Sequence, residues 1–231
     1  MSDRPTRRIL HTADLHIAFS GDKGCQSLEA VVNTAIKSRA DLLLIAGDLF
    51  DHNRVEEKLI EFVMAQFWRL PIPIVILPGN HDCLVPGGVF SRTDFWKSCR
   101  NLHVIHETQG ETLDLPYLKV SIWGKPIDTY LGDIHPMQGK PQPVDSSLWN
   151  IAVAHGYFVD TESPHFPSYH ITEQEIVEHH WDYVALGHVP MFRCVCNDPV
   201  AYYSGSPLIS GTAALVELDE KAGVHVTKCL L

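Results

Sequence analysis

The chain has 231 residues, of which 45% are hydrophobic and 20% are charged, a composition typical of a globular protein with one sizeable core. Its 18 basic and 28 acidic side chains give a net charge of −10, which argues against a protein that binds nucleic acid mainly through a basic surface. This charge leaves room for a metal-dependent enzyme that acts on phosphates, and the 14 histidines favour metal or acid–base chemistry.

The cysteines and the apolar runs bear on cellular location. Six cysteines are present without a CxxC pair, and a chain of this length does not need disulfides, so we interpret them as reduced thiols. No apolar stretch follows the basic N-terminus, and runs such as Leu42 to Ala46 are far too short to span a bilayer. We therefore expect a cytoplasmic protein without a membrane segment.

The first eighty residues alternate between apolar runs and amphipathic segments. Apolar residues at helical spacing predict a helix over Ser27–Arg39, and Asn53 with Glu56 three residues later predicts the cap of a second helix. Continuous apolar runs are typical of strands buried on both faces, and they predict strands over Arg8–Ala13, Asp41–Ala46 and Ile72–Leu77. This β-α-β-α-β order implies parallel strands joined by right-handed crossovers.

Shorter elements follow in the rest of the chain. Thr172 and Glu175 form a capping-box pattern that predicts a helix, whereas Lys125 to Ser147 is rich in turn residues and predicts a long loop. Further strands are predicted over Leu102–His106, Glu111–Leu115, Leu118–Trp123, Asn150–Ala154 and Tyr183–Leu186, with antiparallel strands over Val200–Tyr203, Ala213–Leu218 and Val224–Lys228. No segment resembles a linker, so we expect a single domain over residues 1–231.

Five of the predicted strands end in short loops that carry carboxylate, imidazole or amide groups. In open α/β sheets, the loops at the carboxyl ends of parallel strands form the binding crevice. Glycines beside these groups, Gly47 and Gly79, allow sharp turns and a close approach of the backbone. We expect one common volume to receive the side chains of Asp14, His16, Asp48, Asn80, His81, His155 and His188.

The chemical types of these side chains suit two divalent cations. Carboxylate, imidazole and carboxamide groups together favour manganese, iron, zinc or cobalt over an all-oxygen magnesium or calcium cage. Asp48, which follows the central strand, is the natural group to bridge two ions. Each residue alone is typical of a turn or a surface, but their joint occurrence after five buried strands predicts a metal site.

The five segments, which read D-x-H, GD, GNHD, H-G and GH, resemble the motif set of the calcineurin-like metallophosphoesterase superfamily. Within it, Ala46 to Asp51 and Tyr203 to Pro207 are similar to segments of the SbcD-type DNA-repair exonucleases. The resemblance implies a four-layer α/β/β/α sandwich, in which two mixed β-sheets are flanked by helices. It also implies a centre of two divalent metal ions, with manganese expected first and iron or zinc as alternatives.

The resemblance also implies a role for each site residue. Asp14, His16 and Asp48 would hold the first metal. The second metal would be held by Asp48, Asn80, His155 and His188. His81 would protonate the leaving oxygen or steady the phosphate, and Asp82 would orient His81.

The sequence departs from the family at one first-metal ligand. The usual Gly-His-x-His pattern is replaced by Gly187-His188-Val189-Pro190, and proline has no side-chain donor. Water or another histidine such as His52 would complete the first site, or that site would be weak or empty.

We therefore expect a metal-dependent enzyme that hydrolyses phosphodiester bonds and resembles the core of a DNA exonuclease or endonuclease. Small-molecule phosphatase or cyclic-nucleotide-type phosphodiesterase activity is the first alternative, and a catalytically weak or non-catalytic scaffold of the same fold is the second. The resemblance alone implies an SMC-like ATPase as a partner. The SbcD-type proteins continue into a DNA-capping region and an ATPase-docking segment, and we expect neither in these 231 residues.

Overall fold

Two six-stranded mixed β-sheets pack against each other in this computed structural model, which describes residues 4–139, 141, 145–159 and 168–231. In the first sheet, the strand order is β14 (Gly223–Leu230), β13 (Thr212–Asp219), β1 (Arg7–Thr12), β2 (Leu42–Ala46), β3 (Ile74–Leu77) and β4 (Leu102–Val104). In the second sheet, it is β11 (Phe192–Asn197), β12 (Val200–Ser204), β10 (Tyr183–Gly187), β7 (Trp149–His155), β6 (Val120–Gly124) and β5 (Glu111–Leu115). The predicted pair of mixed sheets is confirmed.

The apolar run of β2 explains how the first sheet is buried on both faces. Leu43 and Ile45 pack against the helices, while Leu42, Leu44 and Ala46 pack against the second sheet. Alternating side chains of a strand point to opposite faces, so a strand between two apolar layers needs apolar residues at every position. The strands β1, β2, β3 and β4 run parallel, as the β-α-β-α-β reading predicts for the first three of them.

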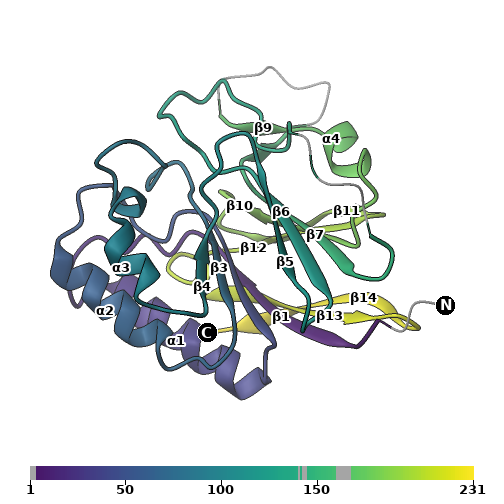
Figure 1. Ribbon diagram of the computed structural model, residues 1–231, viewed down its shortest axis with the longest axis horizontal. Coiled ribbons are helices and arrows are strands. Elements are labelled where there is room, and N and C mark those ends of the chain that lie inside the picture. Colours follow the sequence, from purple (N-terminus) through teal and green to yellow (C-terminus); the bar gives the residue numbers. More distant parts are fainter. Residues whose placement is uncertain (1–3, 140, 142–144, 160–167) are drawn as a thin grey trace.

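Three helices cover the outer face of the first sheet (Figure 1). They are α1 (Lys23–Ser38), α2 (Glu57–Phe67) and α3 (Thr93–Lys97), which a short 3₁₀ helix over Val89–Ser91 precedes. Helix α1 begins four residues earlier than predicted because the carboxylate of Asp22 accepts a hydrogen bond from the backbone N–H of Cys25.

The predicted cap of α2 is wrong. Asn53 does not cap this helix, whose N-cap residue is Glu56. The Asn53 side chain instead donates to the carbonyl of Cys83 and accepts from the backbone N–H of Val89. It therefore stabilises the loop that follows β3 rather than the start of a helix.

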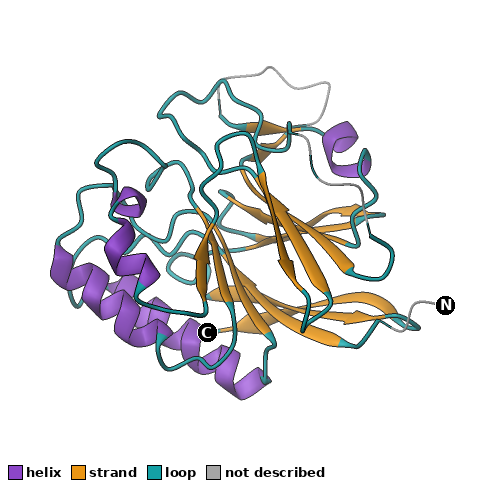
Figure 2. Ribbon diagram, viewed as in Figure 1, coloured by secondary structure: helices purple, strands orange, loops and turns teal. Residues whose placement is uncertain are grey.

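The outer face of the second sheet has a thinner cover. Helix α4 (Glu173–Val177) lies on this side, away from the other three helices (Figure 2), and the predicted capping box of Thr172 and Glu175 is present. A two-stranded sheet of β8 (Tyr157–Phe158) and β9 (His170–Ile171) lies nearby. The described part of Lys125 to Ser147 contains neither helix nor strand, whereas residues 140 and 142–144 lie outside the described residues.

The C-terminal half differs from the prediction in one strand and one direction. The strand β11 was not predicted, and β12 is parallel to β10 although it is antiparallel to β11. The strands β13 and β14 are antiparallel as expected. All six cysteines are free thiols. Within the described residues, no helix has the length and apolar character that a bilayer crossing requires.

A buried histidine joins the two sheets. His11 on β1 is fully buried, and its Nδ1 lies 2.9 Å from the hydroxyl of Tyr183 on β10. Burial lowers the pKa of His11 to about 3, because the charged imidazolium loses its hydration. His11 is therefore neutral in the folded protein at any pH at which the protein functions.

This burial predicts a pH dependence of stability. Between the unfolded pKa of about 6.5 and the folded pKa, only the unfolded chain binds a proton at His11, so stability falls as the pH falls. The variant His11→Gln should flatten the slope of unfolding free energy against pH by up to about 1.4 kcal/mol per pH unit between about pH 4 and pH 6. Urea unfolding at several pH values measures the slope, and an unchanged slope in the variant would contradict the assignment.

Candidate metal centre

The predicted site residues lie at one edge of the sandwich, in the loops that follow five parallel strands. Asp14 and His16 follow β1, Asp48 follows β2, and Asn80 and His81 follow β3. His155 ends β7 and His188 directly follows β10 in the second sheet. The site is thus assembled from both sheets.

Backbone hydrogen bonds hold the first two loops side by side. The N–H of Asp14 donates to the carbonyl of Gly47 (3.1 Å), and the N–H of His16 donates to the carbonyl of Asp48 (3.1 Å). Ile17 and Phe50 then form an isolated parallel bridge. These bonds extend the pairing of β1 and β2 beyond the sheet and fix the separation of their acidic side chains.

Four of the site residues have strained backbones. The φ angles are 57° at Asp14, 47° at His16, 53° at Asp48 and 95° at His188. Positive φ is uncommon outside glycine and costs about 1–3 kcal/mol for each residue. Such strain persists where the surrounding structure fixes it, and its concentration here marks this edge as a functional site.

His155 and His188 gather around the amide of Asn80. The Asn80 Oδ1 atom lies 2.9 Å from His155 Nε2 and 3.0 Å from His188 Nδ1. His155 Nε2 is also 3.2 Å from Asp48 Oδ2. Four predicted ligands of the second metal, including Asp48, therefore converge on a small volume.

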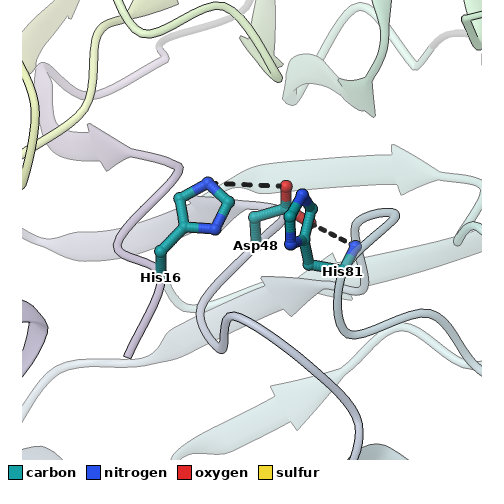
Figure 3. Close-up of side chains that lie close together, drawn as sticks. All are labelled: His16, Asp48 and His81. Atoms are coloured by element: carbon teal, nitrogen blue, oxygen red, sulfur yellow. Dashed lines mark hydrogen bonds and ion pairs between the residues drawn. The ribbon is translucent and has the colours of Figure 1, made fainter. Parts of the chain in front are cut away.

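Asp48 connects this group to the first-metal residues. Its Oδ2 atom, which faces His155, also lies 3.8 Å from His16 Nε2, and His16 Nε2 is 3.9 Å from Asp14 Oδ1. The other carboxylate oxygen of Asp48 accepts the backbone N–H of His81 (2.9 Å). Figure 3 shows the rings of His16 and His81 beside the Asp48 carboxylate.

Asp51 orients the two histidines nearest Asp48. The Nδ1–H of His16 donates to Asp51 Oδ1 (3.0 Å), which leaves the lone pair on Nε2, the atom that faces Asp14 and Asp48. The Nδ1–H of His81 donates to the backbone carbonyl of Asp51 (2.9 Å). A carboxylate that holds the outer nitrogen of a histidine is a common support for a metal ligand.

Asp82 has a different place from the one predicted for it. Its carboxylate is fully buried and accepts the backbone N–H groups of Gly79 (2.8 Å) and Phe50 (3.0 Å). These bonds tie the loop after β3 to the loop after β2. The side chain in contact with the His81 ring is Asp51, at 3.5 Å, and not Asp82.

The electrostatic environment is poor in positive charge. Burial raises the pKa of both Asp14 and Asp82 to about 7. Burial also acts to raise the pKa of Asp48, but the charge of His155 and its hydrogen bond outweigh burial and hold this pKa below its ordinary range. Within the described residues, the ion pairs of Asp14 and Asp48 involve histidines alone.

The histidines respond in opposite directions. Burial would lower the pKa of His155, but the carboxylate of Asp48 raises it to about 9. Burial lowers the pKa of His188 to about 4 and also lowers that of His16. Asp48 therefore favours one positive charge beside it, which either a proton on His155 or a cation can supply.

The donor atoms fit a divalent transition metal. His155 Nδ1–H donates to the carbonyl of Ala46 (2.8 Å), an atom that can only accept. In the neutral ring, Nε2 then carries a lone pair, and it faces two further acceptors on Asp48 and Asn80. Converging acceptors of nitrogen and oxygen type match the ligand sets of manganese, iron and zinc.

The first-metal side of the centre has fewer ligands. Pro190 stands where the family pattern has a histidine, and His52 does not take its place in the structure. His52 is exposed, and it lines a separate hollow together with Ala18, Phe19 and Ser20. Asp14, His16 and Asp48 are thus the protein groups gathered there.

Three supporting residues were not identified as such from the sequence. Besides Asp51, the hydroxyl of Ser206 donates to the backbone carbonyl of Asp14 (2.6 Å), and the hydroxyl of Tyr203 donates to the carbonyl of Gly156 (2.8 Å). Ser206 and Tyr203 belong to the Tyr203–Pro207 segment that carried part of the family resemblance, but local sequence pattern gives no sign of contacts made across the fold.

Comparison with known proteins agrees with this arrangement. Residues 7–204 match the sequence model of the calcineurin-like phosphoesterase family. The chain is 26% identical over 215 residues to the metallophosphoesterase YhaO of Bacillus subtilis, which covers 88% of this chain and 50% of YhaO. It is 27% identical over 259 residues to the SbcD component of the nuclease SbcCD of Staphylococcus epidermidis, which covers 95% of this chain and 65% of that component. The chain therefore spans about half to two thirds of the length of these two relatives.

A solved structure shares the fold. The crystal structure of TT1561 of Thermus thermophilus superposes with a TM-score of 0.62 at 15% sequence identity, covering 96% of this chain and 99% of that chain. At this identity, the likeness concerns the arrangement of sheets and helices alone.

Gly47 gives a test of how tightly the centre is packed. A Cβ atom at Gly47, where φ is +90°, would overlap the ring of His155. Gly47→Ala should therefore displace His155 and lower divalent-metal affinity by about 10- to 100-fold. Gly223→Ala is the matched control, because Gly223 has a φ of +85° with no atom within 4 Å of the added Cβ. Calorimetric titration with Mn²⁺ measures the affinities, and equal affinities in the two variants would contradict the prediction.

Proposed function

The chain belongs to the calcineurin-like phosphoesterase family, whose members hydrolyse phosphoester bonds with two divalent metal ions, and we propose that it cleaves phosphodiester bonds in nucleic acid. We propose manganese as the native metal. The similarity to a component of a nuclease supports the choice of substrate, and the mixture of nitrogen and oxygen ligands supports the choice of metal.

One observation carries the proposal. A single oxygen of Asp48 faces His155 Nε2 at 3.2 Å on one side and His16 Nε2 at 3.8 Å on the other. This oxygen is suited to bridge two ions, one held with Asp14 and His16. The other ion would be held with Asn80, His155 and His188. Because Pro190 supplies no ligand, we expect the ion on the side of Asp14 to bind more weakly.

When bound, the two ions supply Lewis-acid polarisation of the phosphoryl group and a water molecule whose pKa is lowered to about 7. The contribution of the chain is to hold its ligands in place beforehand. The N–H of His188 donates to Asp14 Oδ2 (3.0 Å), and the N–H of His81 donates to Asp48 Oδ1. These bonds fix both acidic side chains without occupying the oxygens that face His16 and His155.

We assign His81 the role of general acid. Its Nδ1–H is held by the carbonyl of Asp51, so Nε2 is the atom that exchanges a proton with the substrate. In the imidazolium form, Nε2–H gives its proton to the departing oxygen as the phosphorus–oxygen bond breaks, and the ring becomes neutral. Asp51 positions this ring, and Asp82 positions the loop that carries it.

Part of the evidence supports a second candidate function. The net charge of −10 is unfavourable for a long contact with a nucleic-acid backbone, because that contact depends on Lys and Arg. A small phosphodiester or a phosphomonoester avoids this penalty. If the substrate is DNA, we propose a role in DNA repair in the cytoplasm with an SMC-like ATPase partner, by analogy with the nuclease SbcCD.

A substrate panel distinguishes these functions. With Mn²⁺ supplied, we expect hydrolysis of a chromogenic phosphodiester and of single-stranded DNA, and much slower hydrolysis of the matching monoester. Hydrolysis of small esters without cleavage of DNA would overturn the nucleic-acid substrate in favour of the second candidate. No hydrolysis of any substrate with Mn²⁺, Fe²⁺ or Zn²⁺ would indicate a non-catalytic scaffold.

The variant His81→Ala tests the general acid. Turnover of the diester should fall by about 10²-fold or more, because proton transfer to the leaving oxygen is lost. Metal content should not change, because the proposed ligands remain. His52→Ala is the matched control, since it removes an exposed histidine of the neighbouring hollow and should keep full activity. Turnover of His81→Ala equal to that of the control would exclude this role.

A further inference from the structure

A second cluster of metal-binding side chains lies where the two sheets meet at another edge. His103 is on β4, Glu111 begins β5, and His106 is in the loop between them. The strand β4 is the last of the first sheet and β5 is the last of the second, and Figure 1 shows the two strands next to each other. This cluster shares no residue with the catalytic centre.

The carboxylate of Glu111 contacts both histidines. Its Oε1 atom lies 2.5 Å from His103 Nε2, and its Oε2 atom lies 3.5 Å from His106 Nδ1. Oε2 also accepts the backbone N–H of His106 (3.0 Å). One ligand atom from each residue lies within 4.8 Å of the other two, so a single ion can reach all three after small side-chain movements.

The backbone that carries these residues is well fixed. Ile105 is fully buried, and its N–H donates to the carbonyl of Ile76 on β3 (2.9 Å). Glu111 pairs with Gly124 across β5 and β6, and the N–H of Gly110 donates to the carbonyl of Glu107 to close the turn. The three side chains thus start from positions that the two sheets determine.

The charge state of Glu111 suits a cation. Burial acts to raise the pKa of Glu111, but its hydrogen bonds with His103 and with the N–H of His106 outweigh burial and lower the pKa to about 2. The carboxylate is therefore ionised at neutral pH, and its side chain is only 15% exposed. Two neutral imidazoles beside a shielded carboxylate offer two nitrogens and one oxygen to a metal ion.

A hollow opens onto the same two histidines. It has a volume of about 610 Å³, and His103 and His106 form part of its wall. The rest of the wall is mostly apolar and includes Leu84, Phe90 and Trp96. A metal ion can enter through this hollow from solvent, and an ion held by the three side chains keeps one position open toward it.

We propose that His103, His106 and Glu111 bind a third divalent ion of the zinc type, separate from the two catalytic ions. Two imidazoles and one carboxylate form a known zinc ligand set that leaves a fourth position open. Because the ligands come from the edge strands of both sheets, the ion also joins those sheets. Binding to the folded chain alone raises stability, so zinc should stabilise the protein independently of the catalytic centre.

Zinc stoichiometry tests the proposal. Wild-type protein, stripped with a chelator, saturated with Zn²⁺ and desalted, should retain one more zinc per chain than either His106→Gln or His103→Gln. His106→Gln should keep full Mn²⁺-dependent phosphoesterase activity, because its ring lies outside the catalytic centre. His225→Gln, which changes an exposed histidine on β14, is the matched control and should retain the wild-type number of ions.

A second measurement removes the catalytic ions from the comparison. In the Asp48→Asn background, Zn²⁺ should still raise the melting temperature, and adding His106→Gln should abolish that shift and weaken zinc binding by at least tenfold. Equal zinc content in the wild type, His103→Gln and His106→Gln would overturn the proposal and leave the cluster as an ion pair between the sheets. Loss of zinc in His225→Gln as well would overturn it by showing non-specific binding.

Discussion

The burial of Asp48 is the constraint on which the rest of the site depends. This carboxylate is 1% exposed at the end of an interior strand, and an unpaired charge in such a place costs several kcal/mol. The surrounding groups meet that demand with two imidazoles and one backbone N–H. Asp14 and Asp82 add two more buried carboxylates, so the protein alone supplies less positive charge than the site can accept. Binding of divalent cations follows directly from this imbalance.

The two sheets must pack together before this site exists. The first sheet supplies Asp14, His16, Asp48 and Asn80, and the second supplies His155 and His188. A carbonyl of the first sheet, that of Ala46, orients the ring of His155 from the second. Metal affinity and fold stability are therefore linked, and the strained backbones at four ligands are part of the cost of bringing acidic groups together.

The strongest signals in the sequence are those that depend on local pattern. The apolar run ending at Ala46 predicts a strand buried on both faces, and the polar residues just after such strands predict the site. The edge strand β11 escapes prediction because Phe192–Asn197 lacks a clear apolar alternation. The sequence places Asn53 at the start of a helix because its actual partners, Cys83 and Val89, are about thirty residues away. Asp51, Ser206 and Tyr203 support the site through contacts of the same long-range kind, which no sequence window contains.

Anomalous diffraction at the manganese edge, from crystals grown with Mn²⁺, tests the central claim most directly. The account predicts a strong peak among Asp48, Asn80, His155 and His188, and a weaker peak among Asp14, His16 and Asp48, where Pro190 supplies no ligand. Both peaks should lie against the same Asp48 oxygen. A map without manganese density beside Asp48 would contradict the account.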